Sequence, residues 1–333
     1  MSRRIVFLIL LAGITIECRS VIGRPLNLDE LVDSSDTIVT GVATDVRLPL
    51  GSQPSQASPS TPGTGTVAID VQQIVKGSDV PSAITVRFPG NMPILGLKGT
   101  VEGDFRVYFL HRSGTDYVFT SPSYASLPFH KGTYVAQDPE ETIVQGLVST
   151  IEMSSDMSNR LLAIRALDTS KKTMATEALR KVSNSTEPSV HLSVATALVR
   201  RNDVTALTQI ERAFGDPKQI PANLLNNANA AIREGIHDSS AIPTLRRLLK
   251  SESPVTREAA VTALMHTKSA AAVPALVEAL GDPEREIQFV AVTSLGEING
   301  FQKANPSREQ FFRDSASYLS RWRTWARDNG FSE

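Results

Sequence analysis

The chain has 333 residues, with 34 Lys and Arg against 35 Asp and Glu, so its net charge is −1 at pH 7. A charge so close to zero gives no overall field that would draw the protein onto nucleic acid or anionic lipid. With 41% hydrophobic and 21% charged residues, the composition excludes a collagen-like or fully disordered chain, and the length allows two domains with a core each.

Residues 1–20 have the pattern of a secretory signal peptide. Arg3 and Arg4 form a basic start, and residues 5–16 form an apolar run that is short for a membrane span. Cleavage after Ser20 would remove Cys18, the one cysteine of the chain, and would leave a mature protein without disulfides. We therefore expect a secreted, periplasmic or cell-envelope protein, and an uncleaved membrane anchor is the alternative.

Residues 26–137 are expected to form a small all-β domain, either a barrel or a sandwich. A short helix is predicted at residues 26–35, and alternation of apolar residues with period two then predicts strands. The predicted strands are residues 37–47, 66–75, 83–88, 104–111 and 117–121. Residues 49–65 consist mainly of Ser, Pro and Gly, which predicts a flexible insert between the first two strands.

Three segments of this domain, SDTIVTGVATDV, DVQQIVKGSDVP and GDFRVYFLHRSGTDYVFTS, together resemble an OB-like barrel of the kind found in extracytoplasmic modules. OB folds often bind oligonucleotides or sugars. The predicted strands lack a regular set of exposed aromatic residues interleaved with Lys and Arg, which base stacking would need. We therefore expect no nucleic-acid partner.

Residues 141–301 contain an internal repeat that predicts an α-solenoid of about five units. The sequence AVTAL at residues 260–264 returns as AVTSL at residues 291–295. Each unit is predicted to be a pair of helices, and the second helices end in apolar residues at intervals of 31, 34, 32 and 31: Leu167, Leu198, Ile232, Leu264 and Leu295. Mostly small residues are expected where helices of neighbouring units approach: Ala163, Val194, Ala228, Ala260 and Ala291.

These units resemble HEAT-like repeats of the short bacterial type that also occurs in phycobilin lyases. In that family an Arg near the start of the second helix tends to reach back to an acidic residue in the preceding turn. Arg160 and Arg257 match this pattern, with Asp156 and Glu252 nearby, whereas the equivalent positions of the other units hold His191, Leu225 and Gln288. The resemblance implies a charged ladder that is broken in the middle, and it implies no lyase activity, because a repeat fixes a scaffold and not a reaction.

Residues 306–330 are predicted to form a C-terminal capping helix. Its aromatic stripe consists of Phe311, Tyr318, Trp322 and Trp325. An uncapped solenoid would expose a large apolar patch to water, so the stripe is expected to cover the last repeat. The alternative is a partner-binding helix.

The sequence carries no recognisable catalytic or metal-binding motif. None of its five histidines forms an H-E-x-x-H or H-x₃-H pair, and no nucleophile elbow or phosphate-binding loop occurs: His111, His130, His191, His237 and His266. We expect no catalytic residue, no metal ligand and no cofactor.

The combined pattern predicts a non-enzymatic protein-binding scaffold that holds a protein or peptide partner on the concave surface of the solenoid. The candidate partner-binding residues are polar positions on the second helices: His191, Asn226, Asn227, Arg257 and Gln288. One alternative is a carbohydrate-active or hydrolytic β-domain with the solenoid as targeting module, which would need carboxylates from separate strands to converge. A purely structural envelope spacer is the third possibility.

Overall fold

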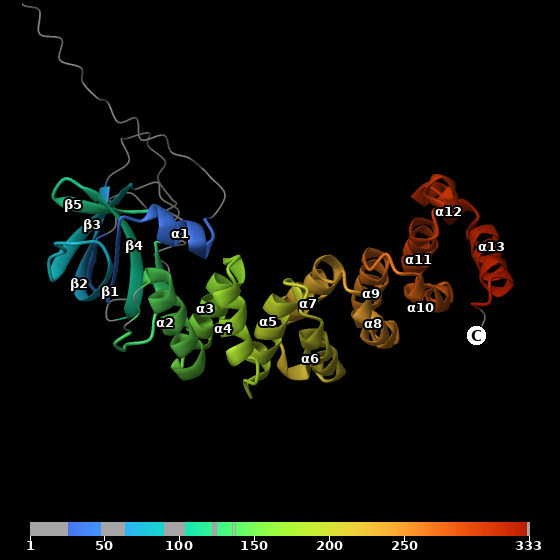
Figure 1. Cartoon of the computed structure of the whole chain (residues 1–333), viewed down its shortest axis with the longest axis horizontal. Helices are drawn as coiled ribbons and strands as arrows, with labels where there is room; N and C mark the ends of the chain where they lie inside the picture. Colours follow the sequence, from blue (N-terminus) through green and yellow to red (C-terminus); the bar gives the residue numbers. More distant parts are fainter. Residues whose placement is uncertain are drawn as a thin grey trace, which may run out of the picture.

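The computed structural model describes residues 26–47, 64–89, 104–121, 125–134, 136 and 138–331. A β-domain lies at one end, and paired helices lead away from it to the C-terminus in an elongated array (Figure 1). The predicted signal peptide and nearly all of the predicted insert lie outside the described residues. Thr64 and Gly65, which we expected in the insert, belong to the second strand.

The β-domain contains a closed five-stranded barrel. The strand order around it is β1, β2, β3, β5 and β4, with β4 paired again to β1, and β6 pairs with β4 outside this ring. Neighbouring strands are antiparallel except β3 and β5, which are parallel. The strands are β1 (Thr37–Arg47), β2 (Thr64–Lys76), β3 (Ala83–Pro89), β4 (Phe105–Ser113), β5 (Asp116–Phe119) and β6 (Ser126–Pro128). The five predicted strands are therefore present, and β6 is an addition too short to carry a period-two signal.

Alternation along the strands divides the apolar residues of the barrel between two cores. One set fills the barrel interior, including Val39, Val67 and Tyr108. The opposite face of β1 and β4, with Ile38 and Phe109, joins the core of the helical array. The two domains are thus held together by one continuous apolar core, because successive side chains of a strand point to opposite faces.

The first helix, α1 (Leu28–Ser34), lies at the junction of the two domains. Asn27 caps it with a capping box, and the apolar face of the helix joins the shared core. The carboxylate of Asp29 accepts a hydrogen bond of 2.8 Å from the backbone N–H of Lys171. On the solenoid side of the junction, Gly146 leaves room for the ring of Phe129, because a Cβ at Gly146 would lie 1.9 Å from that ring.

The solenoid consists of five units, each a first and a second helix. The first helices are α2 (Pro139–Met153), α4 (Thr173–Lys181), α6 (Val204–Gly215), α8 (Ile242–Leu248) and α10 (Val273–Ala279). The second helices are α3 (Met157–Thr169), α5 (Pro188–Val199), α7 (Ala222–Gly235), α9 (Pro254–His266) and α11 (Arg285–Ile298). Short 3₁₀ turns lie in the connections: η2 (Pro217–Gln219), η3 (Ser239–Ala241), η4 (Ala270–Ala272) and η5 (Gln302–Ala304).

The repeat anchors read from the sequence are the residues that bury the solenoid core. The small position of each second helix is fully buried, and the terminal apolar residues are at most 3% exposed. Each second helix contacts the second helix of the next unit, from α3 through α11. Small side chains at these contacts let the helices approach, so the units stack into one core.

The C-terminal segment is two helices and not the one helix predicted. The helices are α12 (Arg308–Arg313) and α13 (Ser315–Asp328). The helical conformation is interrupted at Asp314, whose side chain caps α13 by accepting a hydrogen bond from the N–H of Ser317. Phe311 and Trp322 are buried, and α13 packs against α10 and α11 at the end of the array (Figure 1). Among the described residues, no helix is both long enough and apolar enough to cross a membrane.

Candidate functional site

Each second helix places one residue at the same point, its fourth helical position, beside the loop that joins it to its first helix. These residues are Arg160 on α3, His191 on α5, Leu225 on α7, Arg257 on α9 and Gln288 on α11. The five positions are equivalent in the repeat, so differences among them show where the array departs from regularity.

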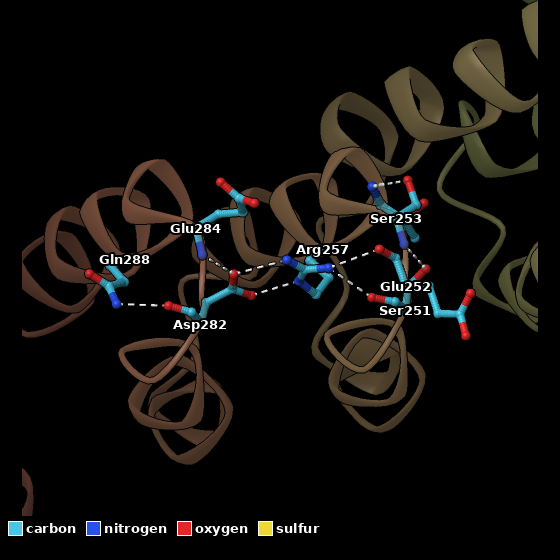
Figure 2. Close-up of polar contacts among 8 residues, drawn as sticks. Ser251, Glu252, Ser253, Arg257, Asp282, Glu284 and Gln288 are labelled. Atoms are coloured by element: carbon cyan, nitrogen blue, oxygen red, sulfur yellow. Dashed lines mark hydrogen bonds and ion pairs between the residues drawn. The ribbon is translucent and has the colours of Figure 1, made fainter.

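Arg257 ties two neighbouring units together. Its Nε and Nη2 donate to the carboxylate of Asp282 in the next unit at 2.7 and 3.0 Å, and its Nη1 donates to the carbonyl oxygens of Ser251 and Glu252 in its own loop (Figure 2). The two side chains are only 10% and 7% exposed. The hydrogen bonds that Arg257 donates to the Asp282 carboxylate raise the pKa of Arg257, so this buried guanidinium stays charged.

Arg160 and Gln288, at the same position in other units, make parts of the same contact. Arg160 donates from Nε to the carbonyl oxygen of Ile151 at 2.7 Å and reaches Ser185 of the next unit at 3.5 Å. Gln288 donates to the carbonyl oxygen of Asp282 in its own loop at 2.7 Å (Figure 2). A bridge from unit to unit is therefore built where the residue is Arg.

The acceptors of these arginines differ from those that the family resemblance implied. The carboxylate of Asp156 caps its own helix by accepting from the N–H of Ser158. Glu252 contributes only its main-chain carbonyl oxygen to Arg257. Both guanidinium groups reach forward to the next unit, where the carboxylate of Asp282 neutralises Arg257 and the hydroxyl of Ser185 accepts from Arg160.

The ladder is broken between the third and fourth units. Leu225 has no donor, and the loop residue that corresponds to Asp282 one repeat earlier is Ser251, which has no charge. A cleft of about 750 Å³ lies at this point, and both residues line it. A cleft is thus found where the sequence replaces the bridging pair with Leu225 and Ser251.

The cleft is formed by α6 and α7 on one side and by α8 and α9 on the other. Its apolar lining includes Phe214, Ala222, Leu225, Leu248 and Val255. Val255 is 45% exposed, which is unusual for a large aliphatic side chain in this protein. Polar and charged residues make up the rest of the lining, and a cavity of this volume can hold a ligand.

The charged residues around the cleft compensate one another. The guanidinium of Arg247 makes a bidentate pair with Glu211 at 2.7 and 2.8 Å, and this contact raises the pKa of Arg247. Lys250 and Glu252 are exposed charges of opposite sign. The charged side chains that line the cleft therefore sum to zero.

Asn229 is the one deeply buried amide in the wall of the cleft. Its side chain is 4% exposed, and its Oδ1 has no hydrogen-bond partner within the described residues. An unpaired buried polar group of this kind costs about 1–3 kcal/mol relative to one that is satisfied. Such a group marks either a source of strain or a place where a partner is recognised.

The five residues proposed from the sequence do not form one site. Asn226 is exposed and lines the cleft, whereas Asn227 is exposed but does not line it. His191 is half-buried on α5. Arg257 and Gln288 meet at Asp282, where their hydrogen bonds hold the array together (Figure 2).

Sequence reasoning missed the residues that give the cleft its character, namely Phe214, Asn229 and Val255. One signal was present, because Leu225 was recognised as a departure from the Arg pattern. Asn229 could have been suspected from its place directly after the small position Ala228, where the helix faces its neighbours. Nothing in the sequence indicated that the departure opens a cavity.

The remaining candidates for chemistry are weaker. His237 and His266, isolated in the sequence, stack with their ring centroids 5.6 Å apart. Within the described residues, no group of three or more His, Cys, Asp or Glu side chains is placed to hold a metal ion. A cleft of about 290 Å³ in the described part of the β-domain has no carboxylate in its lining, so it gives the hydrolytic alternative no support: Thr40, Gln72, Gln73, Phe105, Lys131, Gly132 and Thr133.

Comparisons with known proteins identify a repeat family in part of the chain, and they indicate no activity. A family model described as HEAT repeats matches residues 221–296, which run from the end of the η2 connection through most of α11 and include much of the cleft. An engineered protein of known crystal structure from a structural genomics consortium is similar at 19% identity, over 54% of this chain and 96% of its own, with a TM-score of 0.34. A search of curated proteins finds no match.

Proposed function

We propose that this protein is an exported, non-enzymatic scaffold that holds a protein partner on the concave surface of its solenoid. The observation that carries the proposal is the cleft between the third and fourth units, whose charged side chains sum to zero, set in an array of HEAT-type repeats. Such repeats generally mediate contacts between proteins, because stacked units present an extended surface.

The second helices are the proposed concave layer. Each of them packs closely on the next, whereas successive first helices approach one another less closely. In a curved array the layer with the shorter spacing lies on the inside. This supports a partner surface made of α3, α5, α7, α9 and α11.

The proposed location outside the cytoplasm rests on residues 1–20, whose pattern is that of a secretory signal. The β-domain would then be an OB-like extracytoplasmic module, and the closed five-stranded barrel supports that interpretation. Fractionation of the host, together with the mass of the mature N-terminus, tests this part. A chain that starts at Val21 and leaves the cytoplasm is expected, and an unprocessed cytoplasmic chain contradicts it.

Photo-crosslinking in the full chain tests the partner surface. A photoreactive residue placed at exposed Asn227 on α7 is expected to capture a discrete partner, and the same residue at exposed Glu177 on α4 serves as the control on a first helix. Capture at Glu177 but not at Asn227 would move the partner to the other layer. Capture at neither position would contradict the scaffold function.

A further inference from the structure

The cleft between the third and fourth units offers an amide recognition element. Asn229 and Asn226 lie three residues apart on α7, which places them on the same face of the helix, and both line the cleft. A side-chain amide carries two N–H donors and one carbonyl acceptor. It therefore complements a peptide group, which carries one of each.

The buried amide is the part of this element that requires a partner. Oδ1 of Asn229 accepts no hydrogen bond from the described residues, although the side chain is nearly enclosed. Because this oxygen has almost no accessible surface, the Asn229 side chain would turn toward the cleft to meet the backbone N–H of an entering segment, and its Nδ2 group could donate to a carbonyl oxygen in return. Asn226, exposed at the mouth, could take up a second peptide group.

The charged residues that line the cleft determine which side chains of a bound segment can enter it beside that peptide group. Arg247 and Glu211 already neutralise each other, and Lys250 and Glu252 have opposite signs. A charged side chain entering the cleft would lose hydration without gaining an unpaired counter-charge. Uncharged side chains lose nothing of this kind, and apolar ones gain contact with Phe214, Leu225 and Val255.

We propose that the cleft binds a short, extended, uncharged segment of a partner protein, with one backbone peptide group paired to Asn229 and an apolar side chain on Phe214, Leu225 and Val255. This inference rests on the proposed scaffold function and specifies the partner chemistry at one site. The volume of about 750 Å³ suits a few residues of such a segment.

The break in the ladder is what makes this site possible. In the last two units the equivalent positions hold Arg257 and Asp282, whose side chains fill the space between the units. Leu225 and Ser251 leave that space open. Restoring the pair at these two positions should therefore close the site without touching Asn229.

The test uses the full chain and an array of capped octapeptides made of uncharged residues, with matched arrays in which one position is Asp or Lys. Binding is expected for a subset of the uncharged peptides, with the charged versions about tenfold weaker or absent. Binding that favours charged peptides, or no binding by any octapeptide, overturns the proposal.

Backbone recognition is tested with N-methylated versions of a peptide that binds. Methylation of the one amide that faces Asn229 should weaken binding about tenfold, and Asn229→Leu should weaken the unmethylated peptide to a similar extent. In Asn229→Leu the methylation should have no further effect. If methylation weakens binding equally in the wild type and in Asn229→Leu, Asn229 does not contact the peptide group.

Two further variants separate this inference from the scaffold function. Leu225→Arg combined with Ser251→Asp should abolish octapeptide binding, whereas Asn223→Ala, at an exposed position of the same helix outside the cleft, should not change it. If a partner captured by photo-crosslinking is held equally well by the wild type, by Asn229→Leu and by the double variant, the scaffold function stands and the cleft is not its site. If no partner is captured, the scaffold function itself fails.

Discussion

Two neighbouring contacts in the solenoid differ in one pair of side chains. Between the fourth and fifth units, Arg257 and Asp282 form a buried ion pair that spans the two loops. Between the third and fourth units, Leu225 and Ser251 hold the equivalent places, and a cleft lies there instead. The second helices pack onto their neighbours at both contacts, so the backbone repeat continues while the space between the loops is used differently.

The comparison shows how a repeat protein can make one specific site in a regular array. The bridged contact pairs the charged groups of Arg257 and Asp282 with each other. The unbridged contact keeps an unpaired amide at Asn229 and an exposed aliphatic side chain at Val255. Under our proposal, stability and partner binding belong to adjacent contacts of the same array.

Breaking the bridged contact should have the largest effect. Arg257→Ala leaves the carboxylate of Asp282 buried without its cation, which should destabilise the C-terminal units by about 3 kcal/mol. Chemical denaturation followed by the fluorescence of Trp322 and Trp325, both on α13, measures it. A loss below about 1 kcal/mol would mean that the pair contributes no more than an exposed ion pair does.

Away from the cleft, α7 packs tightly against α5 at Gly235, so this position should not tolerate a larger side chain. A Cβ at Gly235 would lie 2.4 Å from the carbonyl oxygen of Val199 and 2.8 Å from the Cα of Arg200, so Gly235→Ala forces the backbones of α5 and α7 apart. We expect about 2 kcal/mol of destabilisation, measured as the shift in the denaturation midpoint. Gly215→Ala, where a Cβ has no neighbour within 4 Å, is the matched control and should be nearly neutral.

Removing the unpaired amide should stabilise the protein. Asn229→Leu replaces a buried polar group that lacks a partner with an apolar group of similar size, which should raise the free energy of unfolding by about 1 kcal/mol. Thermal unfolding of the two proteins measures the change. Destabilisation instead would show that Asn229 makes contacts that hold α7 in place, and the case for a binding role would weaken.

Transplanting the bridge should give a gain of similar size. Leu225→Arg with Ser251→Asp installs the pair of the fourth and fifth units in the cleft, and we expect about 1 kcal/mol of stabilisation, because this pair would remain partly solvated. Each single variant should be neutral or destabilising, since it introduces one unpaired charge. A double variant no more stable than the two singles combined would contradict the equivalence of the two contacts.

The smallest effect is expected for Gln288→Ala. Its hydrogen bond to the carbonyl oxygen of Asp282 is a neutral one within the same loop, so its loss should cost about 0.5–1 kcal/mol. The same fluorescence assay compares it directly with Arg257→Ala. A loss equal to that of Arg257→Ala would show that the loop geometry, and not the ion pair, holds the last two units together.

Much of the fold could be read from the sequence because it depends on local periodicity. The alternation of apolar residues located five strands, and the repeat interval located the small and terminal residues of each second helix, all of which are buried. The break of the C-terminal segment at Asp314 was missed, because the aromatic stripe continues through it in helical spacing. The candidate site was harder to predict from the sequence, because only Asn226 of the five proposed residues lines the cleft.

The sequence by itself determined the period of the array, the identity of its core positions and the point at which the Arg pattern fails, because each follows from side-chain type at a fixed spacing. Tertiary structure decided which contacts the residues at these positions make. The partner of Arg257 is Asp282, in the next unit, and the burial that leaves Asn229 unpaired comes from helices that meet only in the folded array. Acceptors and cavities between units depend on how the units stack, and stacking is a property of contacts distant along the chain.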